Sequence, residues 1–140
     1  MPEIRFDTGL STYDINGAVT VSFNPTDTNF VERLFETFDQ LDKLQQDQEK
    51  DAGAGSPMAE FFQRGRQRDQ EMRGIIDNTF GAPVCEALFG PMNLYALADG
   101  LPVWCNLVLS VMEEVDGGLN REQKRTNARL AKYTAKYKKK

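Results

Sequence analysis

Few residues of this chain have side chains that could perform chemistry. Its 140 residues include two Cys and no His. Without His, the sequence lacks the usual general base of serine and cysteine hydrolases and the commonest metal ligand. Cys85 and Cys105 are too far apart for a CxxC site, and their apolar neighbours predict thiols that behave as small hydrophobes. We therefore expect neither cysteine to be catalytic.

The carboxylates do not form a recognisable site either. Pairs occur at Glu113-Glu114 and at Asp39/Asp42, but neither adjoins a Gly-rich phosphate loop or a second acidic set that would complete a Mg²⁺ site. The glycines of 51–57 are not followed by Lys-Ser/Thr, so we interpret this segment as a flexible linker. Asp99 is expected to face solvent at a helix end. The sequence therefore predicts a non-enzymatic protein with no cofactor and no metal site.

Charge is divided unevenly along the chain. The formal net charge is −4, yet residues 119–140 hold nine basic side chains and one acid, which leaves residues 1–118 strongly acidic. A Lys-rich arm makes salt-dependent phosphate contacts, but the acidic body argues against nucleic acid as the partner. Docking of the tail on the acidic surface of a neighbouring copy is the alternative. The lysines considered for either contact are Lys132, Lys136, Lys138, Lys139 and Lys140.

Alternating apolar residues predict strands within residues 1–24. Ile4 and Phe6 share one face of a short strand over 3–7. Residues 11–15 and 18–23 flank Asn16-Gly17, the strongest short-range hairpin signal. Because an isolated hairpin is marginal in water, its apolar face must pack on a helix or on another subunit.

Helical spacing dominates the following segments. We expect a long first helix over 25–50, capped by Asn24 and leaving the body after Leu44, where the sequence becomes wholly polar. A linker over 51–57 leads to a second helix over 58–79. Its arginines are expected on a solvated face. They are Arg64, Arg66, Arg68 and Arg73.

Gly and Pro divide the remaining residues into shorter elements. We expect a helix from Pro83 to Phe89, another from Pro91 that contains Leu94, Tyr95, Leu97 and Ala98, and a buried last helix that ends at Asp116-Gly117-Gly118. The predicted fold is α+β, mostly α: a hairpin of two to three short strands over 1–24, then four to six helices. The domain covers 1–118, with a helical part over 58–118, and a basic tail covers 119–140.

The distribution of apolar residues along the sequence favours a cytoplasmic protein. No run of apolar residues reaches the length of a membrane span, and the N-terminal MPEIRFDTG lacks the apolar core of a signal peptide. Aromatic and aliphatic residues at helical spacing are the candidates for protein contacts, although spacing alone does not separate core from interface. These candidates are Phe30, Leu34, Phe38, Leu41, Phe80, Phe89 and Trp104.

Four segments carry a resemblance to known proteins: FNPTDTNFVERLFETFDQLDKLQ, RDQEMRGIIDNTFGAPVCEALFG, MNLYALADGLPVWCNLVLSVMEEVD and KYTAKY. Together they resemble a family of small proteins encoded in the tail-gene region of phages and prophages of Gram-positive bacteria. Residues 76–99 also resemble the helical segment of siphophage tail assembly chaperones, which carries an ID-x-x-FG, FG, N, D pattern. That pattern falls on Ile76, Asp77, Phe80, Gly81, Phe89, Gly90, Asn93 and Asp99.

The resemblance implies an assembly role. A tail assembly chaperone coats the tape measure protein, recruits tail tube subunits and is absent from the finished virion. For this chain, the resemblance implies a non-enzymatic, self-associating protein that acts in the host cytoplasm. Such a protein would bind tape measure and tail tube proteins through apolar surface. Two alternatives stay open: a structural tail component of the virion, such as a completion or connector protein, and a nucleic-acid-binding accessory protein that uses the Lys-rich tail.

Overall fold

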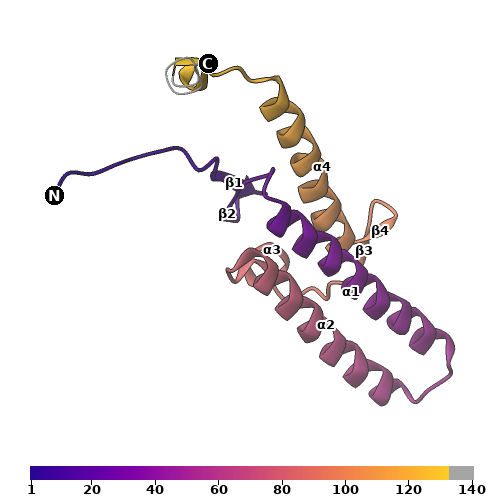
Figure 1. Ribbon diagram of the computed structural model, residues 1–140. Coiled ribbons are helices and arrows are strands. Elements are labelled where there is room, and N and C mark those ends of the chain that lie inside the picture. The colour runs from indigo at the N-terminus through magenta and orange to yellow at the C-terminus, as the bar shows by residue number, and fades with distance from the viewer. Residues whose placement is uncertain (133–140) are drawn as a thin grey trace.

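The computed structural model describes residues 1–132, within which a β-hairpin precedes four helices and a second, two-residue hairpin (Figure 1). Antiparallel α1 and α2 lie side by side, and α4 crosses α1 (Figure 1). This architecture confirms the predicted α+β, mostly α class. The elements are β1 (Ser11–Ile15), β2 (Val19–Phe23), α1 (Thr28–Gly53), α2 (Met58–Phe80), α3 (Val84–Phe89), β3 (Leu97–Ala98), β4 (Leu101–Pro102) and α4 (Val103–Lys124).

The first hairpin forms where the Asn-Gly pair predicts it. β1 and β2 pair antiparallel from Ser11↔Phe23 to Ile15↔Val19. Asn16 and Gly17 have φ of 56° and 68°, the positive values that a tight type I′ turn requires. The strand predicted over 3–7 is wrong, because this segment stands apart from the body and pairs with no second strand among residues 1–132 (Figure 1).

The start of α1 lies further along the chain than predicted. Asp27 is the N-cap, and its Oδ1 accepts a hydrogen bond from Asn29 N at 3.0 Å. Asn24 instead fixes the preceding turn: its Oδ1 accepts from Thr26 N at 2.8 Å, and its Nδ2 donates to the carbonyl oxygen of Thr8 at 2.9 Å. The predicted cap at Asn24 is wrong because its side chain forms this local turn in place of a helix start.

The end of α1 also differs from the prediction, because the helix stays on the body after Leu44. Gln45 and Gln48 are buried. Gln45 Oε1 accepts from Trp104 Nε1 at 3.0 Å, and Gln48 Oε1 accepts from Arg68. Polar side chains tolerate burial when they are hydrogen-bonded, so a wholly polar sequence can still face the interior. The helix continues to Gly53, inside the segment expected to be linker.

The helix predicted from Pro91 does not form. Leu97 pairs with Pro102 and Ala98 with Leu101 in a minimal hairpin, and Asp99 and Gly100 turn the chain with φ of 55° and 79°. Asp-Gly is a strong hairpin signal in its own right. It outweighs the helical spacing from Leu94 to Ala98, so Asp99 lies at a turn rather than at a helix end.

The core lies between α1, α2, α4 and the first hairpin. Phe30 stacks on Phe23 with ring centroids 4.4 Å apart, which attaches the hairpin to α1. Thr37 and Thr79 share a buried hydrogen bond of 2.5 Å between α1 and α2. Among the helices within residues 1–132, none combines the length and the apolar character needed to cross a membrane.

α4 continues through Gly117 and Gly118 to Lys124, so the predicted helix end at Asp116-Gly117-Gly118 is wrong. The helix thereby crosses the expected boundary between body and tail. Gly118 is buried because α4 passes close to Pro25: a Cβ atom at Gly118 would lie 2.5 Å from two atoms of the proline ring. Here glycine serves close packing rather than helix termination.

Adjacent glycines provide a test of this contact. Gly118→Ala should lower the free energy of unfolding by about 1 to 3 kcal/mol, because the rigid proline ring cannot move aside without a backbone shift. Gly117→Ala should raise it by about 0.5 to 1 kcal/mol, since its Cβ would meet only the Arg121 guanidinium at 3.5 Å. Urea unfolding of both variants measures the difference. Equal effects of the two substitutions would contradict the contact with Pro25.

Candidate functional site: protein-binding surfaces

The residues predicted to bind partner proteins belong largely to the core. Phe30, Leu34, Leu41 and Trp104 are buried, with exposed fractions of 4% or less. The remaining three, Phe38, Phe80 and Phe89, are partly buried and pack against that core. Helical spacing identified a real apolar stripe, but the stripe faces the interior of this chain.

The exposed apolar side chains lie elsewhere, and the sequence reasoning did not select them. Helical spacing does not distinguish these residues from core residues: Phe35 and Phe38 are three positions apart, yet Phe35 is 55% exposed and Phe38 packs against the core. In the body they are Phe35, Met58, Phe62, Met92, Leu97, Leu101 and Leu119. Single exposed apolar residues are ordinary on protein surfaces. A function can be inferred only where several are held in a fixed arrangement or beside a groove.

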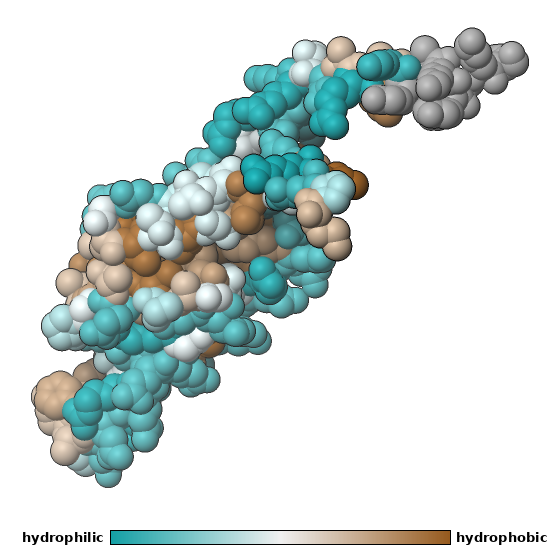
Figure 2. Space-filling model, turned by 90° about the vertical axis from the view of Figure 1, so that its left-hand side faces the viewer, coloured by the Kyte–Doolittle hydropathy of each residue, from teal (hydrophilic) through white to brown (hydrophobic). Residues whose placement is uncertain are grey.

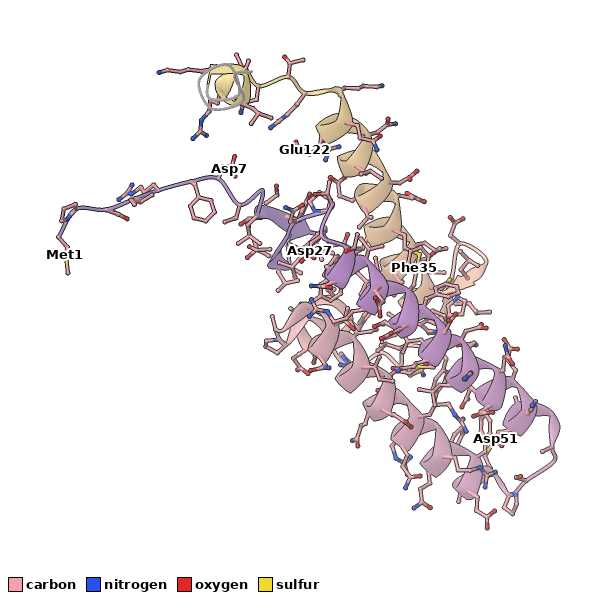
Figure 3. All side chains as sticks on the ribbon, viewed as in Figure 1. Met1, Asp7, Asp27, Phe35, Asp51 and Glu122 are labelled. Atoms are coloured by element: carbon pink, nitrogen blue, oxygen red, sulfur yellow. The ribbon has the colours of Figure 1, made fainter. Side chains whose placement is uncertain are left out.

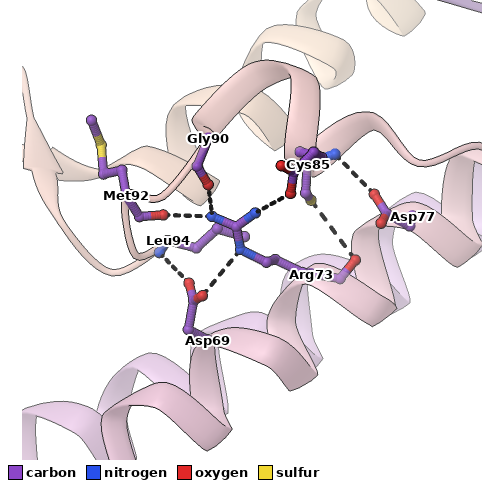
Figure 4. A network of polar contacts seen from close by, with 8 residues as sticks. Asp69, Arg73, Asp77, Cys85, Gly90, Met92 and Leu94 are labelled. Atoms are coloured by element: carbon purple, nitrogen blue, oxygen red, sulfur yellow. Dashed lines mark hydrogen bonds and ion pairs between the residues drawn. The ribbon is translucent and has the colours of Figure 1, made fainter. Parts of the chain in front are cut away.

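One loop with exposed apolar side chains is held in place by a polar network centred on Arg73 of α2 (Figure 4). Its Nε donates to Asp69 Oδ2 at 3.0 Å, and its Nη2 donates to the carbonyl oxygens of Gly90 and Met92 at 2.6 and 2.7 Å. A longer ion pair of 4.0 Å joins Nη1 to Glu86. The Arg73 and Asp69 side chains are each 17% exposed, so little water competes for these bonds.

Two carboxylates of α2 complete the network. The second oxygen of Asp69 accepts from Leu94 N at 2.7 Å, and Asp77 accepts from Cys85 N at the start of α3 at 3.0 Å. One arginine and two aspartates thus attach both α3 and the loop after it to α2. The arrangement holds the backbone of α3 and of the following loop in place.

The far end of the same loop is attached to α4. Val103 N donates to Ala96 O at 2.8 Å, and Asn106 Nδ2 donates to Ala98 O at 2.9 Å. We call residues 90–102 the clamped loop. Three apolar side chains project from it into solvent: Met92, Leu97 and Leu101, with exposed fractions of 49%, 71% and 38%.

Four residues of the chaperone-like pattern lie where the backbone turns in this region, namely Asp77, Gly81, Gly90 and Asp99. Asp77 accepts the hydrogen bond at the start of α3, and Gly81 ends α2 in the left-handed conformation with φ of 66°. Gly90 and Asp99 turn the chain with φ of 53° and 55°. These pattern residues therefore direct the backbone around the clamped loop.

Three of the arginines expected on a solvated face are engaged within the chain. Besides Arg73, Arg68 and Arg64 reach Asp51 across the α1–α2 pair at 2.7 and 3.3 Å. The hydrogen bond from Arg68 lowers the pKa of Asp51. The expectation of a solvated face is correct only for Arg66, which is exposed.

Neither cysteine is activated. Burial raises the pKa of the Cys85 thiol, and the neighbouring Asp77 carboxylate raises it further. Burial also raises the pKa of Cys105, with a smaller contribution from Asp42. Both thiols stay protonated at neutral pH and are poor nucleophiles. In the part of the chain from 1 to 132, no cluster of three or more His, Cys, Asp or Glu could hold a metal ion.

A second surface is an open groove between the first hairpin, α3 and α4. It consists of two adjacent hollows of about 250 and 300 Å³, which share Ile15 and Leu107 in their walls. Figure 2 shows an apolar area framed by polar side chains on the side that carries the hairpin. We call the two hollows together the apolar groove. Its main apolar residues are Ile15, Val21, Leu88, Phe89, Leu107 and Val111.

Most of the candidate lysines of the basic tail lie beyond the described residues. Lys132 is exposed at the end of the described residues, and Lys136, Lys138, Lys139 and Lys140 lie outside them. The last described basic residues of α4 are Arg121 and Lys124. Arg121 pairs with Glu114 at 2.6 Å.

Comparison of the chain with protein-family models, with curated proteins and with solved structures finds no match in any of the three.

Proposed function

We propose that this protein is a non-enzymatic phage tail assembly factor of the tail assembly chaperone type. In this proposal it binds apolar segments of tail proteins, the tape measure protein first among them, through the clamped loop. The observation that carries the proposal is the exposure of Met92, Leu97 and Leu101 on a loop that hydrogen bonds hold at both ends.

The physical argument is one of preorganisation. A flexible apolar loop loses conformational entropy when it binds, whereas a fixed one has already lost it during folding. The Arg73–Asp69 pair and the contacts to α4 supply that fixation. Apolar side chains displayed in a fixed geometry have little benefit for the isolated chain, because they remain in water. They are removed from water, which is favourable, only when an apolar partner segment covers them.

Co-expression with the tape measure protein tests the proposal. The tagged wild-type protein should retain the tape measure protein in a pull-down, and Leu97→Asp should reduce the retained amount at least tenfold. Phe62→Asp is the matched control, because Phe62 is a similarly exposed apolar residue on α2 and should leave binding unchanged. Failure of the wild-type protein to bind, or equal binding by Leu97→Asp, would contradict the proposal.

Mass spectrometry of purified virions separates this function from a structural one. A chaperone is expected to be absent from mature particles. Stoichiometric presence there would instead support a tail completion or connector protein, in which the same loop contacts a permanent neighbour.

A further inference from the structure

The N-terminal arm, residues 1–10, is an extended segment with apolar side chains and no partner strand within the described residues. Ile4 and Phe6 are 93% and 75% exposed. They alternate with charged residues, so both side chains lie on the same side of the extended chain. Figure 3 shows the arm from Met1 to Asp7 standing apart from the body.

The base of the arm is anchored, which sets the direction in which it leaves. Asn24 Nδ2 donates to Thr8 O at 2.9 Å, and Gly9 N donates to Asp7 Oδ1 at 2.8 Å. Gly9 has φ of 72° and lies against the Asn24 side chain. The arm enters β1 at the end opposite to the Asn16-Gly17 turn, whereas the apolar groove begins beside that turn. The arm would therefore have to reverse its direction to cover its own groove.

We propose that the N-terminal arm of one copy of this chain lies in the apolar groove of a second copy. Residues two apart in an extended chain are about 6 to 7 Å apart on the same side, so Ile4 and Phe6 present two neighbouring knobs. The groove presents two neighbouring hollows that share walls. A closed apolar cavity of roughly 150 Å³ holds benzene, so hollows of about 250 and 300 Å³ accommodate a phenyl ring and a branched aliphatic chain.

The rim of the groove carries polar groups that can bond with an extended chain. Asp14 on β1 and Glu114 on α4 line one hollow, where Asp14 Oδ1 accepts a hydrogen bond from Gly17 N at 2.8 Å and Glu114 pairs with Arg121 at 2.6 Å. Asn16 and Ser110, which belong to both hollows, are exposed and can bond with the arm backbone. An arm that enters with its apolar side inward keeps Glu3, Arg5 and Asp7 on its opposite side, where Arg5 pairs with Glu3 at 3.0 Å.

The area is sufficient for a specific complex. A buried aromatic side chain removes about 150 to 250 Å² from water, and the groove surface beneath it is covered as well. Reciprocal exchange of two arms, each burying Ile4 and Phe6, therefore removes roughly 1,000 Å² or more in total, where specific interfaces begin. Reciprocal exchange gives a two-fold dimer, and one-way exchange gives an open chain of copies.

Sedimentation velocity of the purified chain between about 1 and 100 μM tests this without any tail protein, so its outcome is independent of the function proposed above. The wild-type protein should associate. Ile4→Asp/Phe6→Asp, which removes the knobs, and Ser110→Trp, which fills the groove from an exposed position of α4, should each raise the dissociation constant at least tenfold. Phe62→Asp should not change it, and circular dichroism confirms that each variant is folded.

Complementation then locates the contact. The arm variant keeps an intact groove and the groove variant keeps an intact arm, so an equimolar mixture of the two should associate where each alone does not. A Phe6→Cys/Ser110→Cys chain should form a disulfide between copies. The proposal is overturned if the wild-type chain stays monomeric at 100 μM, if association survives the arm variant, if the mixture fails to associate, or if removal of residues 125–140 alone abolishes association.

Discussion

Replacing Trp104 with alanine should lower the free energy of unfolding by about 3 to 5 kcal/mol, because it opens a large cavity in the core. The indole is 1% exposed, and Phe38 meets it edge-on with ring centroids 5.5 Å apart. The substitution also removes the donor to the buried Gln45 Oε1, and an unsatisfied buried acceptor adds to the loss. Urea unfolding followed by circular dichroism measures the change.

Two further substitutions separate the contributions to this loss. Trp104→Phe keeps most of the ring and removes the N–H donor, so it should cost about 1 to 3 kcal/mol. Phe35→Ala is the surface control: Phe35 is 55% exposed on α1 and should change stability by about 0.5 kcal/mol or less. A Trp104→Ala variant as stable as the wild-type protein would show that the ring is not a core residue in solution.

Replacing Arg73 with alanine should cost about 3 kcal/mol. The guanidinium neutralises a carboxylate that is only 17% exposed and also bonds two backbone carbonyls, so its removal leaves Asp69 largely buried without its cation. Arg66→Ala is the matched control on the same helix, because Arg66 is exposed and should be within about 0.5 kcal/mol of the wild-type protein.

A double-mutant cycle assigns this loss to the pair. Asp69→Asn combined with Arg73→Ala should be less destabilising than the sum of the single changes, because the second change no longer breaks an intact ion pair. Hydrogen exchange at Leu94 N, which donates to Asp69, should accelerate in both single variants. Additive effects with unchanged exchange at Leu94 would contradict the inference that the Arg73–Asp69 pair holds the clamped loop.

The Arg73–Asp69 pair also connects stability to the proposed function. If Met92 and Leu97 bind a partner because the loop is fixed, Arg73→Ala should weaken the pull-down under conditions where the variant remains folded. Leu97→Asp should weaken the same interaction without a comparable loss of stability, since the side chain is 71% exposed. The two variants therefore distinguish the geometry of the loop from its apolar contacts.

The elements that the sequence predicted correctly are those with strong local determinants. Asn16-Gly17 specifies the first hairpin because both residues accept positive φ at little cost. Gly81 ends α2 for the same reason, and the predicted second helix over 58–79 agrees with Met58–Phe80 to within one residue. The Asp99-Gly100 turn had an equally local signal, but the apolar spacing around it was given more weight.

The division of apolar and polar side chains between core and surface depended on contacts that no local pattern contains. Trp104 and Gln45 are 59 positions apart, and Leu94 and Asp69 are 25 apart. A polar residue such as Gln45 is buried only because a donor from a distant helix lies opposite to it.

The amino-acid sequence by itself therefore determined the α+β class, the first hairpin, the second helix and the supply of apolar side chains. The tertiary structure alone decided which of those side chains face inward. Phe30 and Trp104 enter the core, whereas Leu97 and the arm residues Ile4 and Phe6 remain in water. The physical reason is that a side chain is buried only when a second surface covers it. The spacing of residues along one segment describes the surface of that segment and does not show what covers it.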